Sequence, residues 1–266
     1  MNKPFTFKNL AASMAFFALS GSVFAQSDVS LEAALGHAPG IQNEAQGAFA
    51  FDAVREIGMT YGMRGGLAWE NRRIGEMLER HAARLDRIYN FQPLMLKESV
   101  APPVMVQTTE TYDQKNPDHV VVADAVYKIE RPERFRYTPP NWREYLLRSD
   151  QFNPAETGGW TPRTEAERAA WEKAVREGWQ VGITQAHEML EANFARLSRD
   201  LEGMILYRKL VARNMTTVPV VSSSEMGVTG NDRELNINER VLRIESPARM
   251  NHDPFEWRTS TTPRDR

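Results

Sequence analysis

The feature that most constrains the fold is a helical pattern of about fifty residues, 165–214, broken only by scattered glycines. Thr164 and Glu167 have the spacing of a capping box at its start, in which each side chain satisfies a free backbone N–H group. At about 1.5 Å per residue the helix would be on the order of 75 Å long. A compact domain cannot bury such a length, so we expect this helix to bend at a glycine or to project.

Small residues recur along one side of this helix. Gly178, Gly182 and Ala186 are four residues apart and form a smooth strip that the backbone of another helix can approach closely. The strip predicts either packing against a helix of the same chain or a contact with another subunit.

A second helical pattern covers residues 44–90 and contains the glycine cluster 62–66. Apolar residues recur at steps of three and four before and after this cluster, which predicts a pair of amphipathic helices. The cluster lacks the G-x-G-x-x-G spacing of a nucleotide-binding loop. We therefore interpret it as a hinge between the two helices.

Short β-prone runs occupy the remaining segments, at 104–106, 120–122 and 125–129. Pro139-Pro140-Asn141 predicts the start of a short helix through Leu147. Runs at 234–237 and 240–244 flank Asn238-Glu239, which predicts a tight hairpin turn there. The predicted fold class is α+β, mainly α-helical, with one long helix and small antiparallel strand or hairpin elements.

The N-terminus has the organisation of a secretory signal peptide. Lys3 and Lys8 precede an apolar run, and Val23-Phe24-Ala25 has the small-x-small pattern of a cleavage site. The apolar run is about half the length of a membrane-spanning helix. We expect export, cleavage before Gln26, a flexible lead-in at 26–43, one domain at 44–245 and an irregular tail at 246–266.

Composition narrows the class of protein further. Without Lys3 and Lys8, 31 basic residues (33 minus 2) oppose 35 acidic ones, a net charge of −4 that does not indicate a nucleic-acid-binding protein. The sequence contains no cysteine. It therefore offers no disulfide and no lipid-bearing cysteine, and we expect any membrane association to come through partner proteins.

The sequence lacks the common motifs of catalysis and metal binding: a phosphate-binding loop, a G-x-S-x-G elbow and H-E-x-x-H. We therefore expect no catalytic residues, no cofactor and no metal. Two alternatives remain open. A periplasmic hydrolase would require His119, His187 and Asp124 to cluster in a pocket, and a small-ligand-binding protein would require repeated strand–helix units.

Five of the six tryptophans divide into two groups. Trp142, Trp171 and Trp179 follow helical patterns and are expected in the core. Trp160 lies in a glycine-rich loop and Trp257 in the tail, where little local core is available. For these two we predict either a contact with a partner or packing back onto the domain.

Several blocks of the sequence occur in a fixed order between about Phe51 and Ile244. They are REIGMTYGMRGGLAWE (55–70), LDRIYNFQ (85–92), ADAVYKI (123–129), PPNWREYL (139–146), RDLEGMILYRKL (199–210) and NERVLRI (238–244). Together these blocks resemble the DotC family of type IVB (Dot/Icm-like) secretion systems, whose conjugative-plasmid members are called TraI.

The resemblance implies a non-enzymatic structural component of an outer-membrane core complex. It also implies a location in the periplasm at the outer membrane, and a multi-copy ring assembly for conjugation or effector transport. The implied partners are a DotD-like lipoprotein and a DotH-like outer-membrane component, which the protein helps to place. DotC itself is a lipoprotein, and the absence of cysteine is a departure from that pattern.

Overall fold

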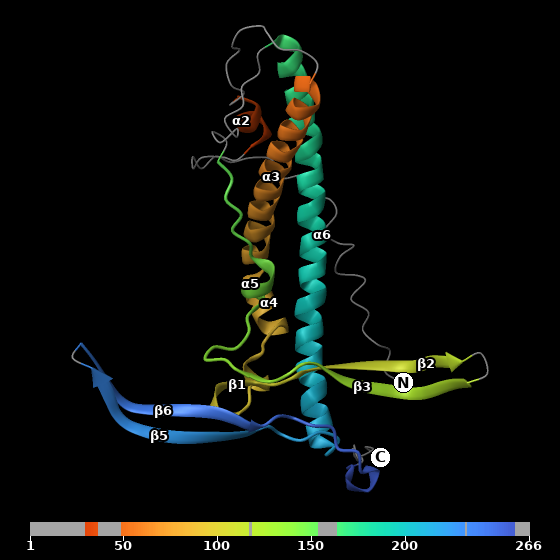
Figure 1. Cartoon of the computed structure of the whole chain (residues 1–266), viewed down its shortest axis with the longest axis vertical. Helices are drawn as coiled ribbons and strands as arrows, with labels where there is room; N and C mark the ends of the chain where they lie inside the picture. The colour runs from red at the N-terminus through yellow and green to blue at the C-terminus, as the bar shows by residue number, and fades with distance from the viewer. Residues whose placement is uncertain (1–29, 37–48, 117–118, 154–163, 232, 259–266) are drawn as a thin grey trace.

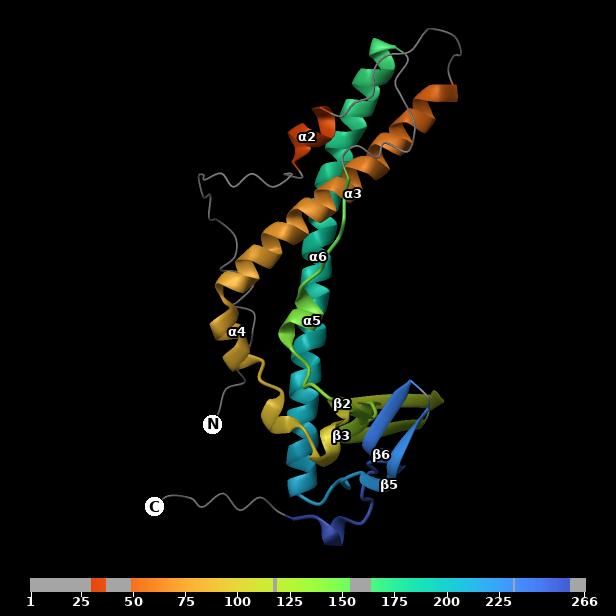
Figure 2. The ribbon, with the colours of Figure 1, turned by 90° about the vertical axis from the view of Figure 1, so that its left-hand side faces the viewer.

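Two long helices lying side by side form the body of the molecule. The computed structural model describes residues 30–36, 49–116, 119–153, 164–231 and 233–258. α3 (Phe49–Arg80) and α6 (Glu165–Ala212) run in the same direction, as Figures 1 and 2 show. The hydroxyl of Thr164 accepts a hydrogen bond from the backbone N–H of Glu167 at 3.1 Å. The predicted long helix and its N-cap are confirmed.

α3 passes through the glycine cluster without a break, so the predicted hinge at 62–66 is wrong. A Cβ atom on Gly62 would lie 2.8 Å from Cα of Val175, and one on Gly66 would lie 3.0 Å from Cα of Trp179. These glycines are therefore required for space. They cost some helix propensity, and in exchange the backbone of α6 packs directly on that of α3.

The strip on α6 faces this same contact. A Cβ on Gly178 would lie 3.0 Å from Cα of Met59, and one on Gly182 would lie 2.7 Å from the backbone nitrogen of Leu67. Ala186 is fully buried. The intramolecular alternative is the one observed. The alternative that Gly178, Gly182 and Ala186 contact a partner is therefore wrong, because α3 of the same chain already covers this strip.

A long crossover connects the two parallel helices. It runs to the far end of the molecule, contains one short antiparallel strand pair, β1 with β4, and the first of the two hairpins described below, and then returns beside α6 and α3. Asn141 accepts a hydrogen bond from the backbone N–H of Arg143 at 3.0 Å, which caps the predicted short helix. Outside that hairpin, the elements of the crossover are α4 (Ala82–Ile88), η1 (Gln92–Leu94), η2 (Lys97–Ser99), β1 (Val100–Ala101), β4 (Arg134–Phe135) and α5 (Trp142–Leu146).

Two antiparallel hairpins extend to opposite sides near the C-terminal end of α6 (Figure 1). The first pairs β2 (Val104–Asn116) with β3 (His119–Arg131), so the predicted short runs belong to much longer strands. The second pairs β5 (Val220–Asn231) with β6 (Glu234–Ser246). A Cβ on Gly203 would lie 2.7 Å from the carbonyl oxygen of Met105, so this glycine lets β2 cross α6 closely.

The predicted turn at Asn238-Glu239 is wrong, because both residues lie inside β6. Asn238 has a φ of +59°. In the strand register Gly227 opposes Glu239 and the next residue, Val228, opposes Ile237, so Asn238 is the extra residue of a β-bulge. Asparagine tolerates this left-handed conformation, which serves β-bulges as well as turns. The turn signal in the sequence therefore marked an irregularity within a strand.

The segments predicted to be irregular contain ordered contacts. Within the expected lead-in, α2 (Leu31–Gly36) places Ala34 in the core, fully buried. Within the expected tail, η3 (Pro254–Glu256) lies near the end of α6. There the side-chain amide of Asn251 donates to the carbonyl oxygen of Asn214 at 3.0 Å.

Apolar contacts are distributed along α6 in three clusters instead of one central core. The predicted core residues Trp142, Trp171 and Trp179 are all buried. None of the described helices has an apolar stretch long enough to cross a membrane. The α+β class with one long helix is confirmed. The clusters contain, respectively, Val54, Tyr61, Trp171, Val175 and Trp179; Leu78, Phe91, Trp142, Tyr145 and Leu197; and Met105, Tyr207, Leu210 and Ala248.

Candidate functional site

A buried ionic junction attaches the first hairpin and α5 to the long helix. Asp200 of α6 is fully buried and forms an ion pair with Arg131 of β3. The hydroxyl of Tyr145 on α5 donates to the Asp200 carboxylate at 2.7 Å. Burial, followed by this hydrogen bond to a carboxylate, raises the pKa of Tyr145 to about 12. Because a buried carboxylate needs its partners, the junction holds three elements in one arrangement.

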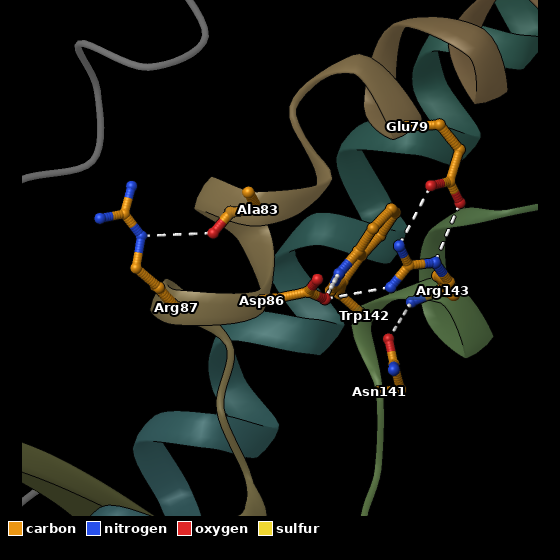
Figure 3. A network of polar contacts seen from close by, with 7 residues as sticks. All are labelled: Glu79, Ala83, Asp86, Arg87, Asn141, Trp142 and Arg143. Carbon is orange, nitrogen blue, oxygen red and sulfur yellow. Dashed lines mark hydrogen bonds and ion pairs between the residues drawn. The ribbon is translucent and has the colours of Figure 1, made fainter.

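A second polar network joins the end of α3 to α4 and α5 (Figure 3). The guanidinium of Arg143 donates to both oxygens of Glu79, at 2.9 and 3.1 Å, and to Asp86 at 3.0 Å. The indole N–H of Trp142 donates to the same Asp86 oxygen at 2.7 Å. Arg143 also lies over the Trp142 ring, 4.3 Å from its centroid. These contacts hold α4 and α5 in a fixed position at the C-terminal end of α3.

The charges in this network are matched to one another. The hydrogen bond from Trp142, aided by Arg143, lowers the pKa of the Asp86 carboxyl. The hydrogen bonds that Arg143 donates to Glu79 raise the pKa of Arg143. Asp86 therefore stays ionised and bound to its partners. Such an arrangement suits a structural fastening better than proton transfer, which requires a pKa near the working pH.

An open groove of about 400 Å³ lies beside this network. Its lining comes from α4, from the segment after it and from the turn leading into α5, and includes Tyr89, Phe91 and Pro140. Both carboxylates that line the groove are paired, Asp86 with Arg143 and Glu144 with Arg136 at 2.6 Å.

The residues of the hydrolase alternative are not brought together. His187 on α6 lies 3.2 Å from a carboxylate oxygen of Glu70 on α3, whereas Asp124 is exposed on β3. The side chain of His119 is outside the described part of the chain. Within the described residues, no group of three or more His, Asp or Glu side chains is placed to hold a metal ion. A hydrolytic site of this composition is not supported.

The two tryptophans predicted as partner contacts have different outcomes. The ring N–H of Trp257 donates to the carbonyl oxygen of Asn251 at 3.0 Å, and 42% of the residue remains exposed. It thus folds back and still presents surface. Trp160 lies outside the described residues.

The β5–β6 hairpin carries an extensive exposed apolar surface. Six of its apolar residues are each more than half exposed. Sequence reasoning missed this surface because it placed a turn in the middle of β6. The alternation of Leu235 and Ile237 with polar residues was the available signal. The six residues are Val220, Met226, Val228, Leu235, Ile237 and Val241.

Comparison with curated protein sequences found no match. The family model described as type IV secretory system, conjugal DNA–protein transfer, matches residues 49–259. The match runs from the first residue of α3 past η3, so it includes both networks and both hairpins. The chain therefore belongs to this TraI family of type IV secretory system proteins.

Proposed function

We propose that the protein is a DotC-like, non-enzymatic structural component of the outer-membrane core complex of a type IVB apparatus. In this role it helps to place and stabilise a DotH-like channel component, together with a DotD-like lipoprotein. The observation that carries the proposal is the family match over residues 49–259. The matched family consists of conjugal transfer proteins of type IV secretory systems. The match therefore supports a role as a component of such a transfer apparatus.

The physical character of the molecule supports a scaffold role. Its polar networks are internally matched and connect separate elements, which is what a rigid spacer requires. The β5–β6 hairpin presents exposed apolar side chains, and contiguous exposed apolar surface marks interaction sites.

Location is part of the same proposal. The pattern of residues 1–25 is that of an export signal, and cleavage would leave Gln26 as the first residue. Because the 266 residues contain no cysteine, we infer attachment to the outer membrane through the lipoprotein partner. Intact-mass measurement of envelope-derived protein tests this, and a mass that retains residues 1–25 or a lipid adduct contradicts it.

The decisive experiment follows the DotH-like component in the host. Deleting the gene for this protein is expected to remove the DotH-like component from the outer-membrane fraction and to abolish conjugal transfer. Expression of the intact chain restores both. If the DotH-like component stays at the outer membrane in the deletion strain, the placement role is wrong.

Trp257 provides a finer test of partner contact. Trp257→Ala is expected to weaken co-purification of the DotH-like component by roughly 2 kcal/mol in affinity if the ring is an interface anchor. Phe255→Ala changes an exposed ring in the same segment and serves as the matched control. Equal loss in the two variants points to disruption of the segment and removes Trp257 from the interface. Trp160 remains a proposed contact to be tested in the same way.

A further inference from the structure

The β5–β6 hairpin has two different faces in its outer half. Val228 opposes Ile237 and Gly230 opposes Leu235, so these apolar residues share one face of the hairpin. Thr229 opposes Asn236 on the other face. A two-stranded hairpin is at best marginally stable alone, and an apolar face requires cover. Figure 1 shows that this arm extends away from the helices, which do not cover it.

The free edges of the two strands are unequally protected. Natural edge strands avoid unwanted pairing by carrying charges, lysine or proline. β5 has one charged residue, Glu225, among its twelve, and neither lysine nor proline. β6 carries five charged residues: Glu234, Glu239, Arg240, Arg243 and Glu245. The outer edge of β5 is therefore open to another strand, whereas the charges on β6 restrict its outer edge to a strand with matching polar residues, as β5 has within the hairpin.

The sequence of β6 is complementary to that of β5. Within the hairpin Glu225 opposes Arg240, and Val228 opposes Ile237. Directly opposed pairs of opposite charge or of apolar character stabilise a sheet. The outer edge of β6 presents the same residues in the same order. It therefore matches the outer edge of β5 in the same antiparallel register.

We propose that the β5–β6 hairpin pairs with a second copy of this chain, the outer edge of β5 in one copy lying against the outer edge of β6 in the next. Glu225 of one copy then opposes Arg240 of the other, and the apolar face continues across the junction. Pairing β5 with β5 about its centre would instead oppose two Glu225 carboxylates. The contact is head-to-tail, so it repeats from copy to copy and closes a ring where the rotation allows.

The experiment uses the absence of native cysteine, because every thiol cross-link then reports an introduced pair. Ser224 and Val241 are opposite one another in the hairpin register. A Ser224→Cys protein is mixed with a Val241→Cys protein and treated with a short bis-maleimide. The proposal expects a cross-linked dimer in the mixture and only background in each protein alone. A mixture of Ser224→Cys with Asn236→Cys, which is out of register, also stays at background.

Charge reversal separates pairing between copies from folding of one copy. Adding Glu225→Arg to the Ser224→Cys protein is expected to lower the cross-linked fraction about three- to fivefold. Adding Arg240→Glu to the Val241→Cys partner as well restores it, although each hairpin then contains two like charges. Only a contact between copies is rescued in this way.

The proposal is overturned if the mixture of Ser224→Cys and Val241→Cys does not cross-link, or if Ser224→Cys cross-links equally well with itself. Failure of the double charge reversal to restore cross-linking also overturns it. The purified protein suffices for the test, because the contact needs no other component of the apparatus. The result is therefore independent of the proposed placement of a DotH-like protein.

Discussion

The α3–α6 contact and the β5–β6 hairpin use glycine and apolar residues in opposite ways. At Gly62 there is no room for a Cβ atom, because the backbone of α6 occupies the space. At Gly227 a Cβ atom would meet nothing within 4 Å, and the residue is special only in its φ of +71°. Val175 is fully buried between the helices, whereas Ile237 is 68% exposed on the hairpin. The first region completes the fold of this chain, and the second leaves apolar side chains exposed.

The largest expected effect comes from filling the helix contact. Gly62→Ala places a methyl group against the backbone of Val175, and we expect a loss of about 3 kcal/mol or more in the free energy of unfolding. Gly75→Ala is the matched control in the same helix, since its Cβ would meet only Leu147, at 3.8 Å. That control is expected to gain up to about 1 kcal/mol of helix propensity. Equal denaturation midpoints for the two variants would contradict the close packing.

An intermediate effect is expected from alkaline pH, which weakens the body and not the hairpin. Burial is the main cause that raises the pKa of Tyr61, Tyr145 and Tyr207 to about 12, above the ordinary value of 10. Above pH 10 the unfolded chain loses these protons first. The stabilisation, complete below pH 10, therefore declines as the pH rises through about 12. Each tyrosine contributes up to about 1.4 kcal/mol per pH unit.

Urea denaturation between pH 9 and about 12 measures this decline. Tyr61→Phe is expected to make the pH dependence shallower, because one buried hydroxyl is removed. Tyr137→Phe, at a residue 95% exposed, is the control and leaves the slope unchanged. Identical slopes in the two variants would show that burial of Tyr61 does not govern the response.

The smallest effect on stability is expected on the hairpin. Ile237→Ser removes an exposed apolar side chain and should change the free energy of unfolding by no more than about 0.5 kcal/mol. The same change should reduce cross-linking between copies, since Ile237 lies on the apolar face of the arm. A large drop in the melting temperature would instead show that the hairpin packs on the body.

The elements that were predicted correctly have local signals. The N-cap at Thr164 and the apolar period of α6 are contained within a few residues of sequence, as is the Asn141 cap of α5. The continuity of α3 was not predictable in this way. Glycine at 62 and 66 lowers helix propensity, and only the backbone of a helix more than one hundred residues later explains it.

The polar junctions were also beyond prediction from a single sequence. Arg143 binds Glu79 and Asp86, which are 64 and 57 residues away. Asp200 meets Tyr145 across 55 residues. No spacing rule connects such pairs, because the long crossover decides which of them meet. The β5–β6 surface was missed for a different reason, since asparagine at 238 serves a bulge as readily as a turn.

The parallel arrangement of α3 and α6 has a consequence for how the chain reaches its native state. The contact of Gly62 with Val175 joins residues 113 positions apart. Closing so long a loop costs entropy before any contact compensates it, and topologies rich in such contacts fold slowly. During synthesis in the N-to-C direction, α3 is made long before α6 and cannot yet bury its glycine face. Until α6 is available to pack against it, this face of α3 stays exposed and can associate with the wrong surface. The formation of the native helix pair therefore waits for α6.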